Sequence, residues 1–434
     1  MILIIILNFF ALILLIKKLK IDKSIKMILG ILLLFSFLIL EISNLNLYNL
    51  NEVNVSTYFL WILYLNIFVL TYVFLTSKIT NTNCNKNLII ENIEKSKVII
   101  VMQIVLMIIL LFYSIRFSNF ASLVDDKAEL RMIKYTYLFG SQLEYMFYNY
   151  IVSTIFEITS IIVCILIAKK KLKNIVVVFG IINIFLEMSI GYGRMQLFRI
   201  IIYIIIASFL IKKEKKKFSF KRSILIIVVS TVVFMISTIP TALRLGINIF
   251  DTNEFGEKIL NKQIQQVICY FTGGFRTLDA FIDNGIPNVS YTIGRATLGG
   301  IDEIVCNGIS LVNSNIHSIN SVIGSYTQRP VYIGKGVTFN AFYTCIMDFY
   351  LDFGIVGVFI GAIIHALLLY YVTNNYLKKK NLISAVLCIF VFMNAFSCVY
   401  IWPYQSAETM SCLIVLLILN KKGELVKNED FMDS

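Results

Sequence analysis

The apolar stretch VIIVMQIVLMIILLFYSI, at residues 98–115, decides the fold class of this chain. It contains no charged residue, and it approaches the roughly 20 apolar residues that a helix needs to cross a bilayer. The chain as a whole is 58% hydrophobic, with a mean hydropathy of +0.81, well above a soluble domain. Comparable apolar runs occur at 2–16, 27–42, 58–76, 148–168, 175–190, 197–211, 224–241, 354–373, 382–401 and 404–420. The sequence therefore predicts an all-α integral membrane protein with about eleven transmembrane helices.

The basic residues between these runs alternate along the chain. Every second loop is rich in lysine, and these loops together hold 26 of the 39 Lys and Arg residues. Cytoplasmic loops carry the excess of Lys and Arg in membrane proteins. We therefore expect the C-terminus to be cytoplasmic and the N-terminus to be outside. The formal net charge of +13 then reflects topology, and no nucleic-acid partner is expected.

Arginine does not follow the lysine pattern. Only Arg222 falls in a loop with predicted cytoplasmic location. The remaining arginines lie on the predicted outer side: Arg116, Arg131, Arg194, Arg199, Arg244, Arg276, Arg295 and Arg329. The planar guanidinium binds phosphate through two parallel hydrogen bonds, whereas the lysine ammonium is a point charge. The asymmetry indicates an anionic substrate at the outer face.

The outer loop 242–353 carries most of the candidate site residues within one polytopic membrane domain, 1–434. The loop is rich in Ile, Phe and Tyr, so it is too apolar for a disordered linker. It predicts several short helices on or in the membrane surface. Residues 254–272 present one apolar helical face, and Gly273-Gly274 predicts the end of that helix. Residues 338–352 predict a second helix that runs into Gly354.

Two arginines lie where the predicted sixth and seventh spans meet. The turn reads GYGR at residues 191–194, and its glycines allow a tight bend or a close approach to a ligand. Arg199 follows inside the next apolar run, and a charge at that depth faces a cavity or a partner. We therefore expect Arg194 and Arg199 to contact substrate. The alternative is that Arg194 pairs with Glu187 and that both are structural.

A second glycine-rich stretch, YFTGGFR at residues 270–276, places Arg276 just past the predicted helix end. Backbone N–H groups and a guanidinium could converge on a phosphate in such a turn. A local ion pair of Arg276 with Asp279 or Asp283 explains the pattern equally well. Further candidates for substrate binding, or for solvated loop charges, are Arg244, Arg295 and Arg329.

Paired carboxylates close the outer loop. Asp348 and Asp352 are four residues apart, so a helix places them on one face at the membrane boundary. We expect Asp348 to orient arginines or substrate, and Asp352 to act as a general base. His317 is a further base candidate, although a simple loop histidine gives the same pattern. Glu157, deep in the fifth span, is either an ion-pair partner or a cavity group.

Several kinds of chemistry have no motif in this chain. The sequence contains no GxxxxGK[ST], no dinucleotide-binding glycine pattern and no HExxH, and its cysteines show no CxxC spacing. We therefore expect no metal and no cofactor. Because nucleotide-activated substrates stay in the cytoplasm, a reaction outside must use a membrane-borne leaving group. A lipid pyrophosphate meets this requirement, and arginines would bind it.

Three stretches resemble the oligosaccharide repeat-unit polymerases (Wzy-type) of O-antigen and capsule synthesis. They are GYGR at 191–194 followed by an apolar span, YFTGGFR at 270–276, and NAFYTCIMDFYLDFG at 340–354. The plan of about eleven spans with a large outer loop late in the chain is also similar. The resemblance implies a fold related to the multi-helix lipid-dependent (GT-C-like) glycosyltransferases, in the bacterial inner or cytoplasmic membrane.

The resemblance also implies a metal-independent glycosyltransferase. Its donor would be a growing glycan on undecaprenyl pyrophosphate, and its acceptor would be one lipid-linked repeat unit. Arg194 and Arg276 would hold the departing pyrophosphate. A chain-length regulator and a flippase are the further partners that it implies, whereas the proton acceptor matches no family position firmly.

Three alternatives remain open from the sequence. An O-antigen ligase would differ only in its acceptor. A flippase or exporter of the same lipid-linked sugar should place its charges near the bilayer midplane between two similar halves, and this chain shows neither feature. A sensor or structural membrane protein would not explain why arginine outnumbers lysine outside.

Overall fold

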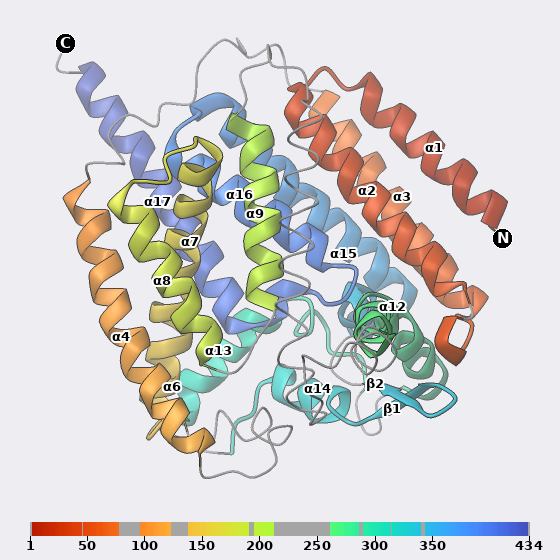
Figure 1. Ribbon diagram of the computed structural model, residues 1–434. Helices are drawn as coiled ribbons and strands as arrows, with labels where there is room; N and C mark the ends of the chain where they lie inside the picture. The colour runs from red at the N-terminus through yellow and green to blue at the C-terminus, as the bar shows by residue number, and fades with distance from the viewer. Residues whose placement is uncertain are drawn as a thin grey trace.

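The computed structural model describes residues 2–45, 47–77, 96–122, 138–190, 195–211, 261–285, 290–313, 315–339 and 343–432. Its elements, labelled in Figure 1 where there is room, are α1 (Ile2–Lys18), α2 (Lys23–Ser43), η1 (Leu47–Asn49), α3 (Val55–Ser77), α4 (Lys97–Ala121), α6 (Gln142–Met146), the π-helical turn η3 (Phe147–Val152), α7 (Ser153–Ala168), α8 (Ile175–Ser189), α9 (Met195–Ile211), α12 (Asn261–Asn284), α13 (Gly299–Ser310), α14 (Ile319–Thr327), β1 (Val331–Gly334), β2 (Val337–Phe339), α15 (Thr344–Lys379), α16 (Leu382–Ser397), η5 (Pro403–Gln405) and α17 (Ala407–Met432).

The described chain is predominantly helical, in agreement with an all-α membrane protein. Five helices are long and apolar enough to cross a membrane, namely α2, α3, α4, the helical stretch Gln142–Ala168, and α15. Shorter apolar helices are α8, most of α9, and α16. Each predicted apolar run coincides with a helix except 224–241, which lies outside the described residues. The count of about eleven spans stays a prediction.

Helix α4 shows how the two sides of a span differ. One face turns apolar side chains outward at helical spacing: Val98, Val101, Val105, Ile108, Phe112 and Ile115. The opposite face buries Leu106 and Leu110 against neighbouring helices, and α8 is the principal one. There the Asn183 side-chain amide donates to the Gln103 carbonyl oxygen at 3.0 Å. An apolar outer stripe with a buried polar contact is typical of helices packed within lipid.

The described parts of loop 242–353 gather at one end of the molecule. Figure 1 shows α12, α13, α14 and the β1–β2 hairpin together, opposite the end where the C-terminal helix α17 finishes. The hairpin is antiparallel, with Tyr332 paired to Thr338. Leu50 forms an isolated bridge to Gly334, which ties the hairpin to the segment before α3. Residues 337–339 are therefore strand rather than the helix predicted from residue 338, because they pair with β1.

Helix α12 continues through Gly273-Gly274, where the sequence predicted a helix end. The glycine at position 273 serves close packing and not a turn of the chain. A Cβ on Gly273 would lie 2.9 Å from the Phe339 ring, so a glycine here permits the hairpin to lie directly on the helix. The continuation places Arg276 in the interior of α12 and not in a glycine-rich turn, so the predicted cradle of free backbone N–H groups is wrong.

Helix α15 is sharply kinked at the end of its first two turns. Phe353 and Gly354 leave helical geometry, and Gly354 has φ +62° and ψ −140°. This conformation is accessible essentially to glycine alone. The segment before the kink, 344–352, carries both predicted carboxylates and packs back on the span, with the Phe349 ring against Gly361. The kink thus decides where Asp348 and Asp352 lie.

Candidate active site

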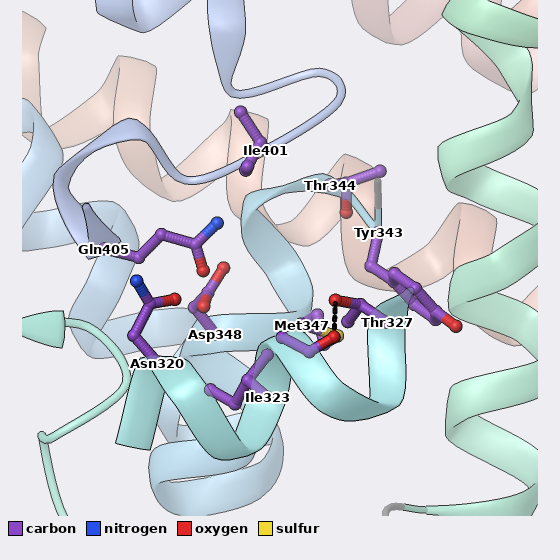
Figure 2. Close-up of a pocket in the computed structure, with 10 residues that line it drawn as sticks. Asn320, Ile323, Thr327, Tyr343, Thr344, Met347, Asp348, Ile401 and Gln405 are labelled. Carbon is purple, nitrogen blue, oxygen red and sulfur yellow. Dashed lines mark hydrogen bonds between the residues drawn. The ribbon is translucent and has the colours of Figure 1, made fainter. Parts of the chain in front are cut away.

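A cavity of about 130 Å³ lies among the outer-end elements. Three segments line it: α14, the start of α15, and, more distant in sequence, the segment between α16 and α17. The lining residues are Asn320, Ile323, Gly324, Thr327, Tyr343, Thr344, Met347, Asp348, Ile401 and Gln405 (Figure 2). No arginine is among these described lining residues. The only charged group that they contribute is the Asp348 carboxylate.

Backbone contacts hold Asp348 at this cavity. The Thr344 N–H donates to the Tyr400 carbonyl at 3.1 Å, and the Cys345 N–H donates to the Cys398 carbonyl at 3.0 Å. These bonds fasten the first turn of α15 to the segment that follows α16. Asp348 comes one turn later, is 1% exposed, and has an Oδ1 without a hydrogen-bond partner in the described structure. A buried carboxylate oxygen with no donor is costly and therefore points to a ligand or a proton.

Asp352, one turn further along the same helix face, is equally buried but fully bonded. Its Oδ1 accepts from the Thr292 hydroxyl at 2.5 Å and from the Ala296 N–H at 3.0 Å. Its Oδ2 accepts from the Thr297 N–H at 2.8 Å. These bonds hold the turn that leads into α13. The sequence predicted Asp352 as the general base, but its carboxylate is occupied by these hydrogen bonds. Asp348, which was predicted to orient arginines or substrate, faces the cavity instead.

Two further polar side chains at the cavity had no signal in the sequence. Gln405 extends from η5 toward Asp348, and Asn320 approaches the carboxylate from α14 (Figure 2). Glu303 of α13 braces this arrangement, because its Oε2 accepts from the Asn320 side chain at 2.9 Å and from the Ala407 N–H at 3.0 Å. These residues come from loops and helices far apart in the chain, so no local spacing in the sequence indicates them.

Arg276 lies away from this cavity and is 4% exposed. Its guanidinium donates to three backbone carbonyls, those of Asn51 at 2.6 Å, Thr272 at 3.2 Å and Ser43 at 2.9 Å. Ser43 is the last residue of α2, so the positive charge sits at the carboxyl end of that helix, where the helix dipole favours it. Burial lowers the pKa of Arg276.

Asp279, one turn later on α12, contacts the amino end of α3. Its carboxylate accepts from the Asn54 N–H at 2.9 Å and from the Thr57 hydroxyl, at the amino end of α3. The helix dipole favours a negative charge at that end. Burial raises the pKa of Asp279, and the two hydrogen bonds oppose that rise. We call Arg276 and Asp279 the α12 clamp, since together they hold the outer ends of α2 and α3.

Arg199 belongs to a second polar cluster, between α7 and α9. It forms an ion pair with Glu157 at 2.7 Å, and the Tyr203 hydroxyl donates to the same carboxylate oxygen. The Arg199 side chain is 19% exposed. Glu157 is therefore an ion-pair partner, one of the two roles that its sequence position allowed. Glu408 and Tyr400 lie within electrostatic reach of Arg199.

The remaining candidates lie on the surface of the outer end or outside the described residues. Arg295 is half exposed and forms an ion pair with Asp302 at 2.8 Å. Arg329 and His317 are exposed, one after the end of α14 and the other before its start. Arg194 and Arg244 lie outside the described residues, as does the whole GYGR turn.

Potential metal ligands do not gather in the described parts of the chain. No group of three or more His, Cys, Asp or Glu side chains there could hold a metal ion. His365, within α15, is buried and bonded through Nδ1 to the Tyr64 hydroxyl at 2.6 Å. Its Nε2 has no partner among the described residues, so the histidine is only half satisfied.

Comparison with protein families and known proteins gives one positive result. The model of the family described as O-antigen polysaccharide polymerase Wzy matches residues 1–420. Comparison with curated proteins and with solved structures gives no significant match. The family match spans nearly the whole chain, including every element that lines the cavity, and it confirms the resemblance seen in the short motifs. The chain therefore belongs to the O-antigen polysaccharide polymerase (Wzy) family.

Proposed function

We propose that this protein polymerises lipid-linked oligosaccharide repeat units at the outer face of the bacterial inner membrane. It transfers the growing glycan from undecaprenyl pyrophosphate to the terminal sugar of an incoming lipid-linked repeat unit. The family match over residues 1–420 is the observation that carries this proposal, and it favours polymerisation over ligation or export. The product serves O-antigen, capsule or exopolysaccharide synthesis.

In this proposal Asp348 is the general base. A hydroxyl of the acceptor's terminal sugar enters the cavity and gives its proton to the Asp348 carboxylate. The hydroxyl oxygen forms a bond to the anomeric carbon of the donor as the bond from that carbon to the pyrophosphate oxygen breaks. The buried carboxylate oxygen without a donor supports this role, since a base must have a lone pair free to take a proton. Asp352 instead positions the turn before α13.

The departing pyrophosphate gains negative charge, and arginines at the outer end stabilise it. Arg194 and Arg199 are the principal candidates, because Arg194 directly precedes α9 in the chain and Arg199 lies near the start of that helix, with a side chain that is 19% exposed. Guanidinium groups bind such an oxyanion in a bidentate manner. Arg244, Arg295 and Arg329 contribute to binding the two anionic lipid carriers as they approach. We assign Arg276 a positioning role through the α12 clamp.

The experiment compares the two carboxylates in purified full-length protein supplied with lipid-linked repeat units. Asp348→Asn keeps the shape of the side chain but removes the base, so polymer formation should fall by about 10²–10⁴-fold while thermal stability is retained. Asp352→Asn should lower thermal stability, because an amide cannot accept all three hydrogen bonds. Its activity should follow the fraction of folded protein.

Glu41→Gln is the matched control. Glu41 also has a buried carboxylate oxygen without a partner in the described structure, but it lies on α2 and outside the cavity. This variant should give a normal glycan length ladder. A normal ladder from Asp348→Asn would refute the assignment of the base.

A further inference from the structure

We propose that the Asp348 cavity is the subsite for the acceptor's terminal sugar and that it selects a sugar without acidic groups. It takes a ring that presents two hydrogen-bond donors, either two hydroxyls or a hydroxyl and an amino group, to Asp348 and Gln405. Gln405 is then a specificity-determining residue. This inference rests on the proposed function and adds the chemical class of the acceptor.

Two hydrogen-bond acceptors of the cavity have no donor in the described structure. Asp348 Oδ1 and Gln405 Oε1 are both buried and both without a donor in the described structure. Two donors nearby are in use, since the Asn320 side-chain amide donates to Glu303 Oε2 at 2.9 Å and the Thr327 hydroxyl donates to the Gly324 carbonyl at 3.4 Å. The Tyr343 hydroxyl points away from the carboxylate (Figure 2). A ligand that brings two donors would pair both oxygens, and buried acceptors left unpaired are costly.

The charge of the cavity points the same way. Its described lining includes the Asp348 carboxylate and no lysine or arginine. A uronate or other acidic sugar would bury its carboxylate beside the Asp348 carboxyl group without a cation to balance it. Placing groups of like charge side by side is a common means of rejecting a ligand. An amino sugar would instead supply the counter-charge.

The cavity is large enough to admit part of the acceptor. Its volume of about 130 Å³ is far more than the roughly 10–15 Å³ that one water molecule needs. One ring of the terminal sugar can therefore present its hydroxyl-bearing edge to Asp348 and Gln405.

The test measures the binding of simple methyl glycosides to the purified full-length protein by saturation-transfer NMR. The probes are the methyl glycosides of glucose and galactose, with their 2-amino and uronic acid counterparts. The neutral or amino forms should bind the wild-type protein at least about 10-fold more tightly than the uronic acids. Asp348→Asn should reduce this discrimination, and Gln405→Glu should increase the preference for the amino forms. Glu41→Gln should leave the order unchanged.

The results separate this inference from the proposed function. Equal binding of uronic acids and neutral sugars to the wild-type protein, or unchanged discrimination in Asp348→Asn, would overturn the inference. Polymer formation, measured on the same preparations, reports on the base. Loss of discrimination in Asp348→Asn with polymerisation intact would support the subsite and refute the base, and the reverse result would refute the subsite alone.

Discussion

At the scale of single residues, Asp348 and Asp352 show how neighbours decide chemistry. They have the same side chain, lie on the same helix face and are each 1% exposed. Asp352 accepts three hydrogen bonds, whereas Asp348 Oδ1 accepts none from the described residues. A carboxylate whose oxygens all have hydrogen-bond donors stabilises the structure. A carboxylate with an oxygen that lacks a donor is available for a proton or a ligand.

A residue-scale prediction concerns Arg194. If its guanidinium grips pyrophosphate through two hydrogen bonds, lysine should not replace it, because an ammonium makes no such pair. Arg194→Lys should lose roughly 30- to 1,000-fold in polymerisation, as expected for a lost charge-assisted contact of about 2–4 kcal/mol. The protein should still insert at a normal level. The glycan length ladder on a gel measures the effect.

Arg222→Lys is the control, because Arg222 lies in a loop with predicted cytoplasmic location. It should leave the ladder unchanged. Full-length glycan from Arg194→Lys would mean that Arg194 contributes only a positive charge to its loop and does not bind pyrophosphate through two hydrogen bonds.

At the scale of elements, α12 joins two helices through the α12 clamp. Removing Arg276 would leave the carbonyls of Ser43, Asn51 and Thr272 without their donor. Arg276→Ala should therefore lower the free energy of unfolding by about 2–4 kcal/mol. The free energy of unfolding of Arg276→Lys should lie between those of the wild-type protein and Arg276→Ala, since one ammonium cannot reach all three carbonyls. Thermal unfolding of the full chain in detergent measures both variants.

The same variants also test the phosphate role that the sequence predicted for Arg276. Unchanged unfolding together with lost polymerisation would restore that role. Unfolding and activity that decline together would support the clamp.

The kink of α15 gives a second prediction at this scale. Gly354 has a positive φ, and a Cβ there would lie 3.2 Å from the Tyr291 hydroxyl. Gly354→Ala should cost about 1–3 kcal/mol through backbone strain and should displace the segment that carries Asp348. Polymerisation should fall more than stability does. Gly324→Ala is a suitable comparison for stability alone, because a Cβ at Gly324 meets no atom within 4 Å. A fully active Gly354→Ala protein would contradict the role given to the kink.

At the scale of the whole molecule, the two ends differ in composition. Figure 1 shows the turns between α1 and α2 and between α7 and α8 at the end where α17 finishes, and both turns are lysine-rich. The α12–α14 elements occupy the other end. We expect a reporter fused after Lys217 or Lys379 to be cytoplasmic and one inserted at Asn313 to be outside. An outside signal at Lys217 would reverse the topology and remove the site from the outer face.

A second prediction at this scale concerns metals. If arginines stabilise the departing pyrophosphate, no divalent cation is required for that step. Polymerisation by the purified protein should therefore continue in EDTA. Loss of activity in EDTA and its recovery with Mg²⁺ or Mn²⁺ would replace the arginine mechanism with a metal-assisted one.

The sequence by itself determined the helical membrane class, because an apolar run long enough to span lipid must satisfy its own backbone hydrogen bonds. It also identified the family through short motifs and placed both carboxylates on one helix face, since a spacing of four is a local property of a helix. It predicted the end of α12 wrongly, because Gly273 serves the packing of Phe339 and does not end the helix. It also predicted the start of α15 too early, because residues 337–339 form β2 and pair with β1.

Only the tertiary structure decided which residues meet. Thr292 and the turn before α13 saturate Asp352, while Gln405 and Asn320 come beside Asp348 from segments on either side in the chain. Arg276 became part of a clamp because Ser43 and Asn51 present carbonyls to it across more than two hundred residues of sequence. A side chain's chemistry depends on such partners and on burial. Both arise when helices pack, so no local pattern along the chain contains them.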